Sequence, residues 1–282
     1  MHGLGNDYVY IDCYKHPNAI KGAKTLAKYF SLSHIGISSD GVIFILPPKD
    51  CQNDFQMRIF NSDGSEGKMC GNGIRCVGKY VYDNGLTTSK KIQIETLSGI
   101  KKLTLFTDED NQVNSVEVNM GRPQIKGLTS LNILGRIIKG YSVSVGNPHF
   151  VVLPKQVQLS EVNDFGRAVE EDPYFAPERT NVEFIEPTKD KDTLRVRVWE
   201  RGSGRTMACG TGACASFAVA NHIKMLPPKA NIVLEGGKLS ISYDKNGNIL
   251  MNGPATTVFS GQITDKQLKQ IIHTKQVIEK IR

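Results

Sequence analysis

The sequence lacks a long uninterrupted hydrophobic run, which excludes a membrane-spanning helix. Its longest apolar stretches, such as Val42–Leu46 and Ala213–Ala220, are far shorter than the roughly 20 residues that a span requires. The first twelve residues also lack the basic start and the apolar core of a secretory signal peptide. We therefore expect a cytoplasmic protein that makes no contact with a membrane.

Concentrated positive charge is also scarce, although the net charge of the 282 residues is +7. The last 19 residues carry five Lys or Arg against two acidic residues, and no basic run with interleaved aromatic residues occurs elsewhere. Nucleic-acid-binding proteins usually have such a run or patch. A generally basic surface is the better interpretation, and we expect no nucleic-acid partner.

The six cysteines form neither a C-x-x-C pair nor a Cys/His cluster at zinc spacing, so we expect no metal. In a reducing compartment most of them would be small buried side chains. Cys76 and Cys214 fit that interpretation, and Cys13 and Cys51 suggest no function. The two remaining cysteines, Cys70 and Cys209, differ because they lie at matching places in an internal repeat.

The chain repeats itself at about half its own length. The segment from Arg58 to Gly73 aligns without a gap to the segment from Arg197 to Gly212, at an offset of 139. Gly41-Val-Ile-Phe-Ile matches Asn181-Val-Glu-Phe-Ile, and Gly5-Asn6 matches Gly146-Asn147, at nearly the same offset. Such a repeat indicates a duplicated domain. In two-domain proteins of this kind the ligand usually binds in the cleft between the halves.

Both halves are predicted to contain short strands and one strong helix. The helices are expected at 74–83 and 213–221, ended by Asn84-Gly85 and Pro227-Pro228. The second is apolar on every face and must be buried all round. The fold class is therefore α+β, with two pseudo-symmetric domains, each a sheet or barrel wrapped around a central helix. Strands are expected at 8–11, 42–46, 56–60, 91–95, 150–153, 182–185, 194–199, 232–234 and 238–243.

The chemistry is predicted at the two helix starts. Cys70 and Cys209 each directly precede a C-G-x-G helix N-terminus, where free backbone N–H groups and the helix dipole bind anions and lower a thiol's pKa. If the halves faced each other, the thiols would oppose each other across one carboxylate-sized site. This arrangement suits two-base inversion of a carbon, in which one thiolate removes a proton and the other thiol supplies one.

Two simpler interpretations compete with this one. A G-x-G before a helix also occurs in nucleotide-phosphate loops, but neither copy completes G-x-G-x-x-G or carries G-K-[ST]. Both cysteines could instead be packing residues beside tight turns. That would be the favoured explanation for either one alone, and it is much weaker for two at matched positions.

Four long segments of the chain resemble diaminopimelate epimerase. They are Met1–Asp12, Phe60–Cys76, Gly146–Phe150 and Trp199–Cys214, and the resemblance runs from residue 1 to about residue 262. It implies an isomerase that interconverts LL- and meso-diaminopimelate in lysine and cell-wall precursor synthesis. It further implies that no pyridoxal phosphate, metal or other cofactor takes part.

The resemblance also implies roles for individual residues. Cys70 and Cys209 would be the acid/base thiols, and His149 and Glu200 would poise the reacting centre. Backbone N–H groups of Gly71-Asn72 and Gly210-Thr211 would hold the reacting carboxylate. Amides, one carboxylate and one guanidinium suit a substrate with two amino-acid ends. The remaining substrate groups would be held by Asn6, Asn61, Asn147, Asn181, Glu200 and Arg201.

The chain departs from the family pattern at three places. It begins at a methionine that is usually a few residues inside the family sequence, which indicates a shortened first strand. Ser38 stands where the family commonly has glycine, and Gly41 where some members have a ligand-binding glutamine, so a contact from position 41 is in doubt. A tail at 264–282 has helical spacing and is expected to dock as a helix, with a partner or membrane-surface role as the alternative.

The expected halves are 1–118, carrying Cys70, and 119–263, carrying Cys209.

The residues themselves are compatible with two other functions. A racemase of the proline-racemase type would also use a pair of thiols. Its substrate lacks a distal amino-acid end, however, so the asparagines and Arg201 would have nothing to bind. A redox or binding module could use the two cysteines as a switch. The expected partner is a small-molecule substrate, and a homodimer is possible.

Overall fold

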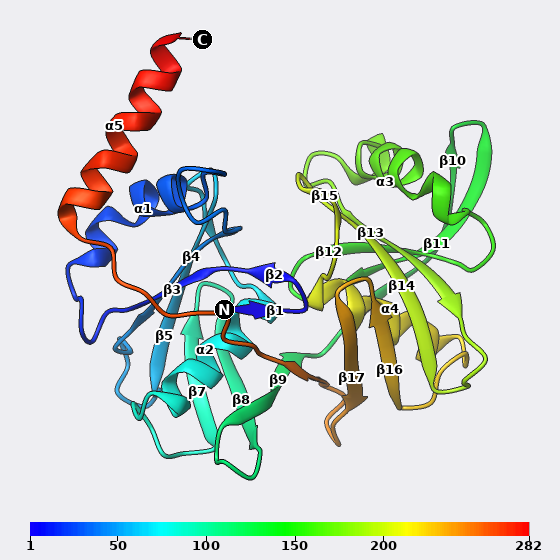
Figure 1. The fold of residues 1–282 in the computed structure, drawn as a ribbon. Helices are drawn as coiled ribbons and strands as arrows, with labels where there is room; N and C mark the ends of the chain where they lie inside the picture. The colour runs from blue at the N-terminus through cyan, green and yellow to red at the C-terminus, as the bar shows by residue number, and fades with distance from the viewer. Residues whose placement is uncertain (282) are drawn as a thin grey trace. The chain divides into compact units, whose positions relative to one another are not determined.

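The computed structural model describes residues 1–281, which divide into two compact units. Unit 1 comprises residues 1–114 and the segment that begins at Ala255. Unit 2 comprises Ser115–Pro254. Figure 1 shows the elements of both units.

Unit 1 is a mixed sheet with a helix packed on it. Strands β3 (Val9–Asp12) and β4 (Gly41–Leu46) pair in parallel, β4 pairs antiparallel with β5 (Phe55–Asn61), and β5 runs parallel to β7 (Lys91–Thr96). Helix α2 (Gly71–Asp83), drawn in cyan in Figure 1, lies against the β1–β2 hairpin and β8. The other elements are β1 (His2–Gly3), β2 (Asn6–Asp7), η1 (Ala19–Gly22), α1 (Ala23–Phe30), β6 (Glu66–Gly67) and β8 (Gly99–Thr107).

Unit 2 repeats this plan. Its strand order is β10-β11-β12-β13-β14-β16-β17-β18-β9, and α4 (Gly210–His222) contacts seven of these strands. Figure 1 shows α4 enclosed by the strands around it. The bounds are β9 (Val113–Gly121), β10 (Gln124–Ile133), β11 (Arg136–Ser144), β12 (Pro148–Val152), η2 (Leu159–Glu161), α3 (Val162–Glu170), η3 (Pro173–Phe175), β13 (Asn181–Pro187), β14 (Thr193–Glu200), β15 (Gly204–Thr206), β16 (Lys229–Leu234), β17 (Gly237–Tyr243) and β18 (Ile249–Pro254).

The repeat seen in the sequence is a repeat of structure. In unit 1, Val9 pairs with Val42 across two parallel strands, and in unit 2 Phe150 pairs with Val182 in the same way. Each unit then places one antiparallel strand and a helix after this pair. The α+β class with two pseudo-symmetric halves, each with a central helix, is thereby confirmed.

The predicted helix starts and several element boundaries were wrong. Both central helices begin three residues earlier than expected, at Gly71 and Gly210, because the cysteine before each glycine caps the helix and the glycines form its first turn. Helix α4 ends at His222, before a left-handed Lys224, and not at the prolines. Helices α1 and α3 and the strands β8 to β11 and β18 were missed, since their half-exposed sequences gain their conformation from pairing and packing.

The last helix, α5 (Asp265–Ile281), is shown in red in Figure 1. Its Leu268 packs against the cluster of unit 1 that contains Phe30 and Phe44. Within residues 1–281, no helix is both long enough and apolar enough to cross a membrane.

Candidate active site

Cys209 occupies the N-cap position of α4. Its Sγ accepts a hydrogen bond from the backbone N–H of Gly212 at 3.3 Å and lies 3.4 Å from the hydroxyl of Thr211. The side chain is buried, with 6% of its surface exposed. The first N–H groups of a helix have no partner within the helix, so the turn at Gly210 and Thr211 presents donors beside the thiol.

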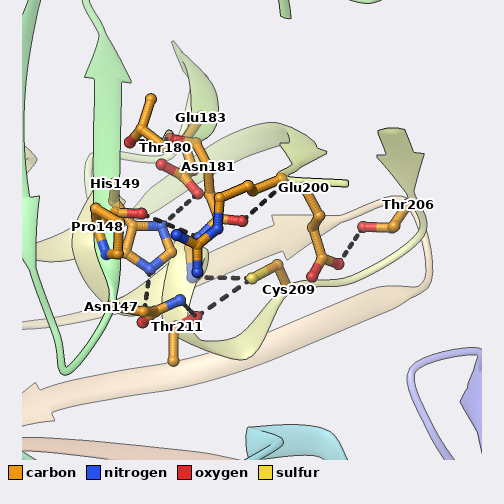
Figure 2. A network of polar contacts seen from close by, with 12 residues as sticks. Asn147, Pro148, His149, Thr180, Asn181, Glu183, Glu200, Thr206, Cys209 and Thr211 are labelled. Carbon is orange, nitrogen blue, oxygen red and sulfur yellow. Dashed lines mark hydrogen bonds and ion pairs between the residues drawn. The ribbon is translucent and has the colours of Figure 1, made fainter. Parts of the chain in front are cut away.

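A chain of polar contacts leads from this thiol into the core of unit 2. Asn147 donates through Nδ2 to Oγ1 of Thr211 at 3.3 Å, and its Oδ1 lies 3.1 Å from Nε2 of His149. Nδ1 of His149 lies 2.7 Å from Oε1 of Glu183. In Figure 2, Cys209 lies near Thr211 and Glu200, and His149 lies between Asn147 and Glu183. The fold therefore gathers three predicted site residues, Asn147, His149 and Thr211, around Cys209.

These contacts define how the imidazole of His149 is held. Oδ1 of Asn147 can only accept, so Nε2 of His149 donates to it. Nδ1 then faces Oε1 of Glu183, in a contact completely shielded from solvent because both side chains are 0% exposed. These two contacts, one at each ring nitrogen, fix the orientation of the imidazole.

Glu183 was not among the predicted site residues. The repeat contains a signal that could have found it, because Glu183 takes the place of Ile43 in an otherwise apolar strand. Both side chains press on the matching glycine of the helix start. A Cβ at Gly73 would lie 2.5 Å from Cδ1 of Ile43, and one at Gly212 would lie 2.6 Å from Oε1 of Glu183. An apolar side chain in unit 1 thus corresponds to a carboxyl side chain in unit 2.

Two further predicted residues lie at the ends of β13 and β14. The buried amide of Asn181 donates to the carbonyl of Pro148 at 3.0 Å and accepts from the backbone N–H of Arg201 at 2.9 Å. The exposed guanidinium of Arg201 donates to the carbonyl of Glu178. These contacts place the backbone of Arg201 directly beside Asn181.

Electrostatics around Cys209 oppose ionisation of its thiol. Burial raises the pKa of Cys209 well above its ordinary value, and the carboxylates of Glu200 and Glu183 raise it further. The hydroxyl of Thr211 and the N–H of Gly212 act in the other direction, with smaller effects. The lowered thiol pKa expected from a helix N-terminus alone is therefore wrong for Cys209, because burial outweighs the effect of the helix.

We predict slow alkylation of Cys209 at neutral pH. The raised pKa of Cys209 keeps the thiol protonated, and only the thiolate reacts. Its rate constant with iodoacetamide, followed by peptide mass spectrometry, should still increase with pH above about 8.5, the ordinary thiol value. Glutathione treated in parallel provides the reference. A rate that levels off at or below the pH found for glutathione would contradict the raised pKa.

Glu200, at the end of β14, accepts a hydrogen bond from the hydroxyl of Thr206. Burial raises the pKa of Glu200 above its ordinary value of 4.5, and the neighbouring carboxylate of Glu183 adds to this effect. The folded protein thus holds the Glu200 proton more tightly than the unfolded chain does. Ionisation of Glu200 accordingly costs stability, and this cost develops as the pH rises through 4.5 and continues to the folded pKa.

Replacing Glu200 by glutamine should therefore stabilise the protein and impair its function. At pH 8 we expect an increase of about 1 kcal/mol in the free energy of unfolding, or about 2 °C in Tm. The gain should disappear at pH 4, where the wild-type carboxyl is largely protonated in both states. Thermal melts of both proteins at the two pH values measure this difference. An equal shift at both would exclude the charge as its cause.

In unit 1, Cys70 caps α2 as Cys209 caps α4. Its Sγ accepts from the backbone N–H of Gly73 at 3.3 Å and lies 3.2 Å from Oδ1 of Asn6, to which the thiol donates. Asn6 in turn donates to Oδ2 of Asp40 at 2.7 Å. Cys70 is only partly buried, in contrast to Cys209. The polar surroundings of the two thiols thus differ, although their places in the repeat are the same.

The other predicted residues of unit 1 lie on α2 and at the end of β5. Asn72 is buried, and its Oδ1 accepts from the guanidinium of the fully buried Arg75 at 2.9 Å. Its amide therefore supports the first turn of α2. Asn61, at the end of β5, donates to the hydroxyl of Ser65 at 3.1 Å.

At Ser38 and Gly41, two positions that depart from the family pattern, the backbone explains which residues fit. Ser38 has a φ of 61°, in the left-handed region that favours glycine, which explains the glycine common at this position. At Gly41 a Cβ would lie only 2.1 Å from the carbonyl oxygen of Phe60. The backbone here leaves no room for any side chain, so position 41 makes no side-chain contact with a ligand.

The arrangement supports proton transfer at a carbon next to a carboxylate. Each unit combines one thiol, the N–H donors of a helix start and amide side chains able to donate and accept. Among residues 1–281 there is no group of three or more His, Cys, Asp or Glu side chains placed to hold a metal ion.

Comparisons with known proteins agree with the resemblance found in the sequence. A family model described as diaminopimelate epimerase matches residues 1–126 and 141–258. A diaminopimelate epimerase of Acetivibrio thermocellus is 43% identical over 282 residues, covering 95% of this chain and 98% of the relative. One of Methanococcus maripaludis is 44% identical, covering 93% of this chain and 98% of the relative.

Solved structures share the fold at low sequence identity. A probable proline racemase of Agrobacterium radiobacter superposes with a TM-score of 0.68 at 18% identity, covering 87% of this chain and 82% of its own. A methylitaconate-delta-isomerase superposes with a TM-score of 0.66 at 12% identity, covering 95% of each chain.

Proposed function

The chain belongs to the diaminopimelate epimerase family, and we propose that it interconverts LL- and meso-diaminopimelate by two-thiol proton transfer. The single observation that carries the mechanism is the matched capping of two helices by Cys70 and Cys209. In both places a thiol sits within 3.3 Å of a backbone N–H at a glycine-rich helix start. If the two cysteines were only packing residues, nothing would require both to cap helices at matching positions of the repeat.

The proposed reaction leaves the enzyme with an unchanged proton count. One thiolate takes the α-proton, so that the C–H bond breaks and an S–H bond forms. The second thiol gives its proton to the opposite face of the same carbon and becomes the thiolate. The raised pKa of Cys209 supports it as the protonated partner in the substrate-free enzyme.

Stabilisation of the carbanion is assigned to the helix starts. An α-proton of an amino acid is weakly acidic, so the negative charge that develops on the carboxylate must be met by fixed donors. Backbone N–H groups of Gly71-Asn72 and Gly210-Thr211 supply them in this proposal, without a cofactor. His149 and Glu200 poise the reacting centre.

The distal half of the substrate is assigned to the amides, Glu200 and the guanidinium. Asn6, Asn61, Asn147 and Asn181 both donate and accept, which suits the ammonium and carboxylate groups of an amino acid. Arg201 offers a planar two-pronged donor for the distal carboxylate. The reaction also needs reduced thiols, which the cytoplasm maintains, so we place the enzyme there.

A direct assay tests the proposed function. Reduced protein is incubated with LL-diaminopimelate, and the stereoisomers are separated by chiral chromatography. We expect the meso form to accumulate until both forms are at equilibrium. L-Proline in a parallel incubation tests the racemase alternative. Turnover of proline alone, or of neither compound by folded and reduced protein, would overturn the proposal.

A further inference from the structure

We infer that Glu170, a buried residue of α3, is a positioning residue. It holds the turn at 200–203 so that Arg201, which lies in this turn, can bind the distal end of the substrate. The inference rests on the proposed function for the role of Arg201. The contacts of Glu170 stand independently of it. The residue lies near the end of α3, and only 3% of its side chain is exposed.

Three donors converge on the Glu170 carboxylate. The indole Nε1 of Trp199 donates to Oε2 at 2.7 Å, and the backbone N–H of Gly202 donates to Oε1 at 2.7 Å. The guanidinium of Arg179 lies 2.7 Å from the same Oε1. Trp199 and Gly202 flank Glu200 and Arg201 in sequence, so one side chain fixes the backbone on both sides of two proposed site residues.

Packing adds to these hydrogen bonds. The indole ring of Trp199 lies against α3 so closely that a Cβ at Gly166 would come within 2.6 Å of it. The turn itself joins β14 to β15 through the hydrogen bond from Ser203 N–H to the Glu200 carbonyl, at 3.0 Å. Asn181 holds the Arg201 backbone from the other side. The backbone at Arg201 and Gly202 is therefore held by Glu170 of α3 and by Asn181 of β13.

These three contacts of Glu170 require a carboxylate at position 170 and not an amide. A glutamine at position 170 would have one accepting oxygen and one donating NH₂ group. If its oxygen faced Gly202 and Arg179, its NH₂ would meet the indole N–H of Trp199. If it turned over, its NH₂ would meet the donors of Gly202 and Arg179. Either orientation sets donor against donor in a buried place, so at least one of the three hydrogen bonds is lost.

This conflict predicts a specific rescue. Glu170→Gln should raise KM for LL-diaminopimelate about tenfold with a smaller change in kcat, because binding of the distal end is lost. Trp199→Phe removes the indole N–H, so the glutamine NH₂ can face the phenyl ring. The double variant should recover most of the tenfold loss, relative to Trp199→Phe alone. A residue that merely stabilised the fold would lower Tm and leave KM of the folded enzyme unchanged.

The single tryptophan provides a readout that does not depend on activity. Its indole N–H gives one resonance in the proton–nitrogen spectrum of uniformly labelled protein, and the bond to Glu170 should protect it from hydrogen exchange. Glu170→Gln should shift this resonance and abolish the protection. Unchanged exchange, or an unchanged KM in an active enzyme, would overturn the inference. An inactive wild-type protein with a protected indole would instead overturn the proposed function alone.

Discussion

Replacing Cys209 or Cys70 by serine is expected to lower kcat for LL-diaminopimelate about 10²- to 10⁴-fold. This is the range that one acid or base group contributes, and a hydroxyl ionises far less readily than a thiol. Both variants should fold, because serine is a preferred helix N-cap and can accept the same N–H from Gly73 or Gly212. Chiral chromatography of the product gives kcat, and thermal melts verify the fold.

The double variant and one control sharpen this prediction. If the two thiols act as one unit, removing both should cost about as much as removing either. Cys51→Ser, at an exposed cysteine far from either helix start in sequence, should leave kcat unchanged. Losses that multiply in the double variant, or a single variant that retains more than a tenth of the activity, would contradict the two-thiol mechanism.

Reaction in heavy water is expected to place solvent deuterium in the product and not in the recovered substrate. Thiols exchange their hydrogen with water while the site is open, so the thiol that protonates the new face carries deuterium. The thiol that removed the substrate proton returns the same proton when the reaction reverses before opening. Starting from the LL form, meso product should therefore contain deuterium at the inverted carbon, and substrate recovered early should contain little.

Mass spectrometry of the separated stereoisomers at low conversion measures this asymmetry. A single base that exchanged with solvent would label both stereoisomers equally from the start. Direct transfer of the substrate hydrogen would leave the product unlabelled. Either pattern would exclude the assignment of Cys70 and Cys209 to opposite faces of one carbon. The Cys51→Ser protein should reproduce the wild-type pattern.

The two thiols lie in chemically different surroundings. Cys70 is partly exposed and donates to Asn6, whereas Cys209 is buried next to Glu200 and near the His149–Glu183 pair. A symmetric fold therefore carries two thiols in unequal surroundings. Comparing the serine variants in the LL-to-meso and meso-to-LL directions would show which thiol serves which face.

The duplication, the α+β class and the two cysteines at helix starts could all be predicted from the sequence. These features are local or repetitive: a capping cysteine, the glycines after it and the apolar helix from Ala213 all act within one or two turns of chain. Family motifs added Asn147, His149 and Glu200, which the fold then gathered near Cys209.

The surroundings of these groups depend on contacts between residues that are far apart in the sequence. Glu183 and Glu170 are separated from their partners His149 and Trp199 by 34 and 29 residues, so no local pattern relates them. The direction of the Cys209 pKa shift depended on the same kind of information. A helix N-terminus is visible in sequence and favours the thiolate, but burial and approaching carboxylates belong to the packed core, and they outweigh it.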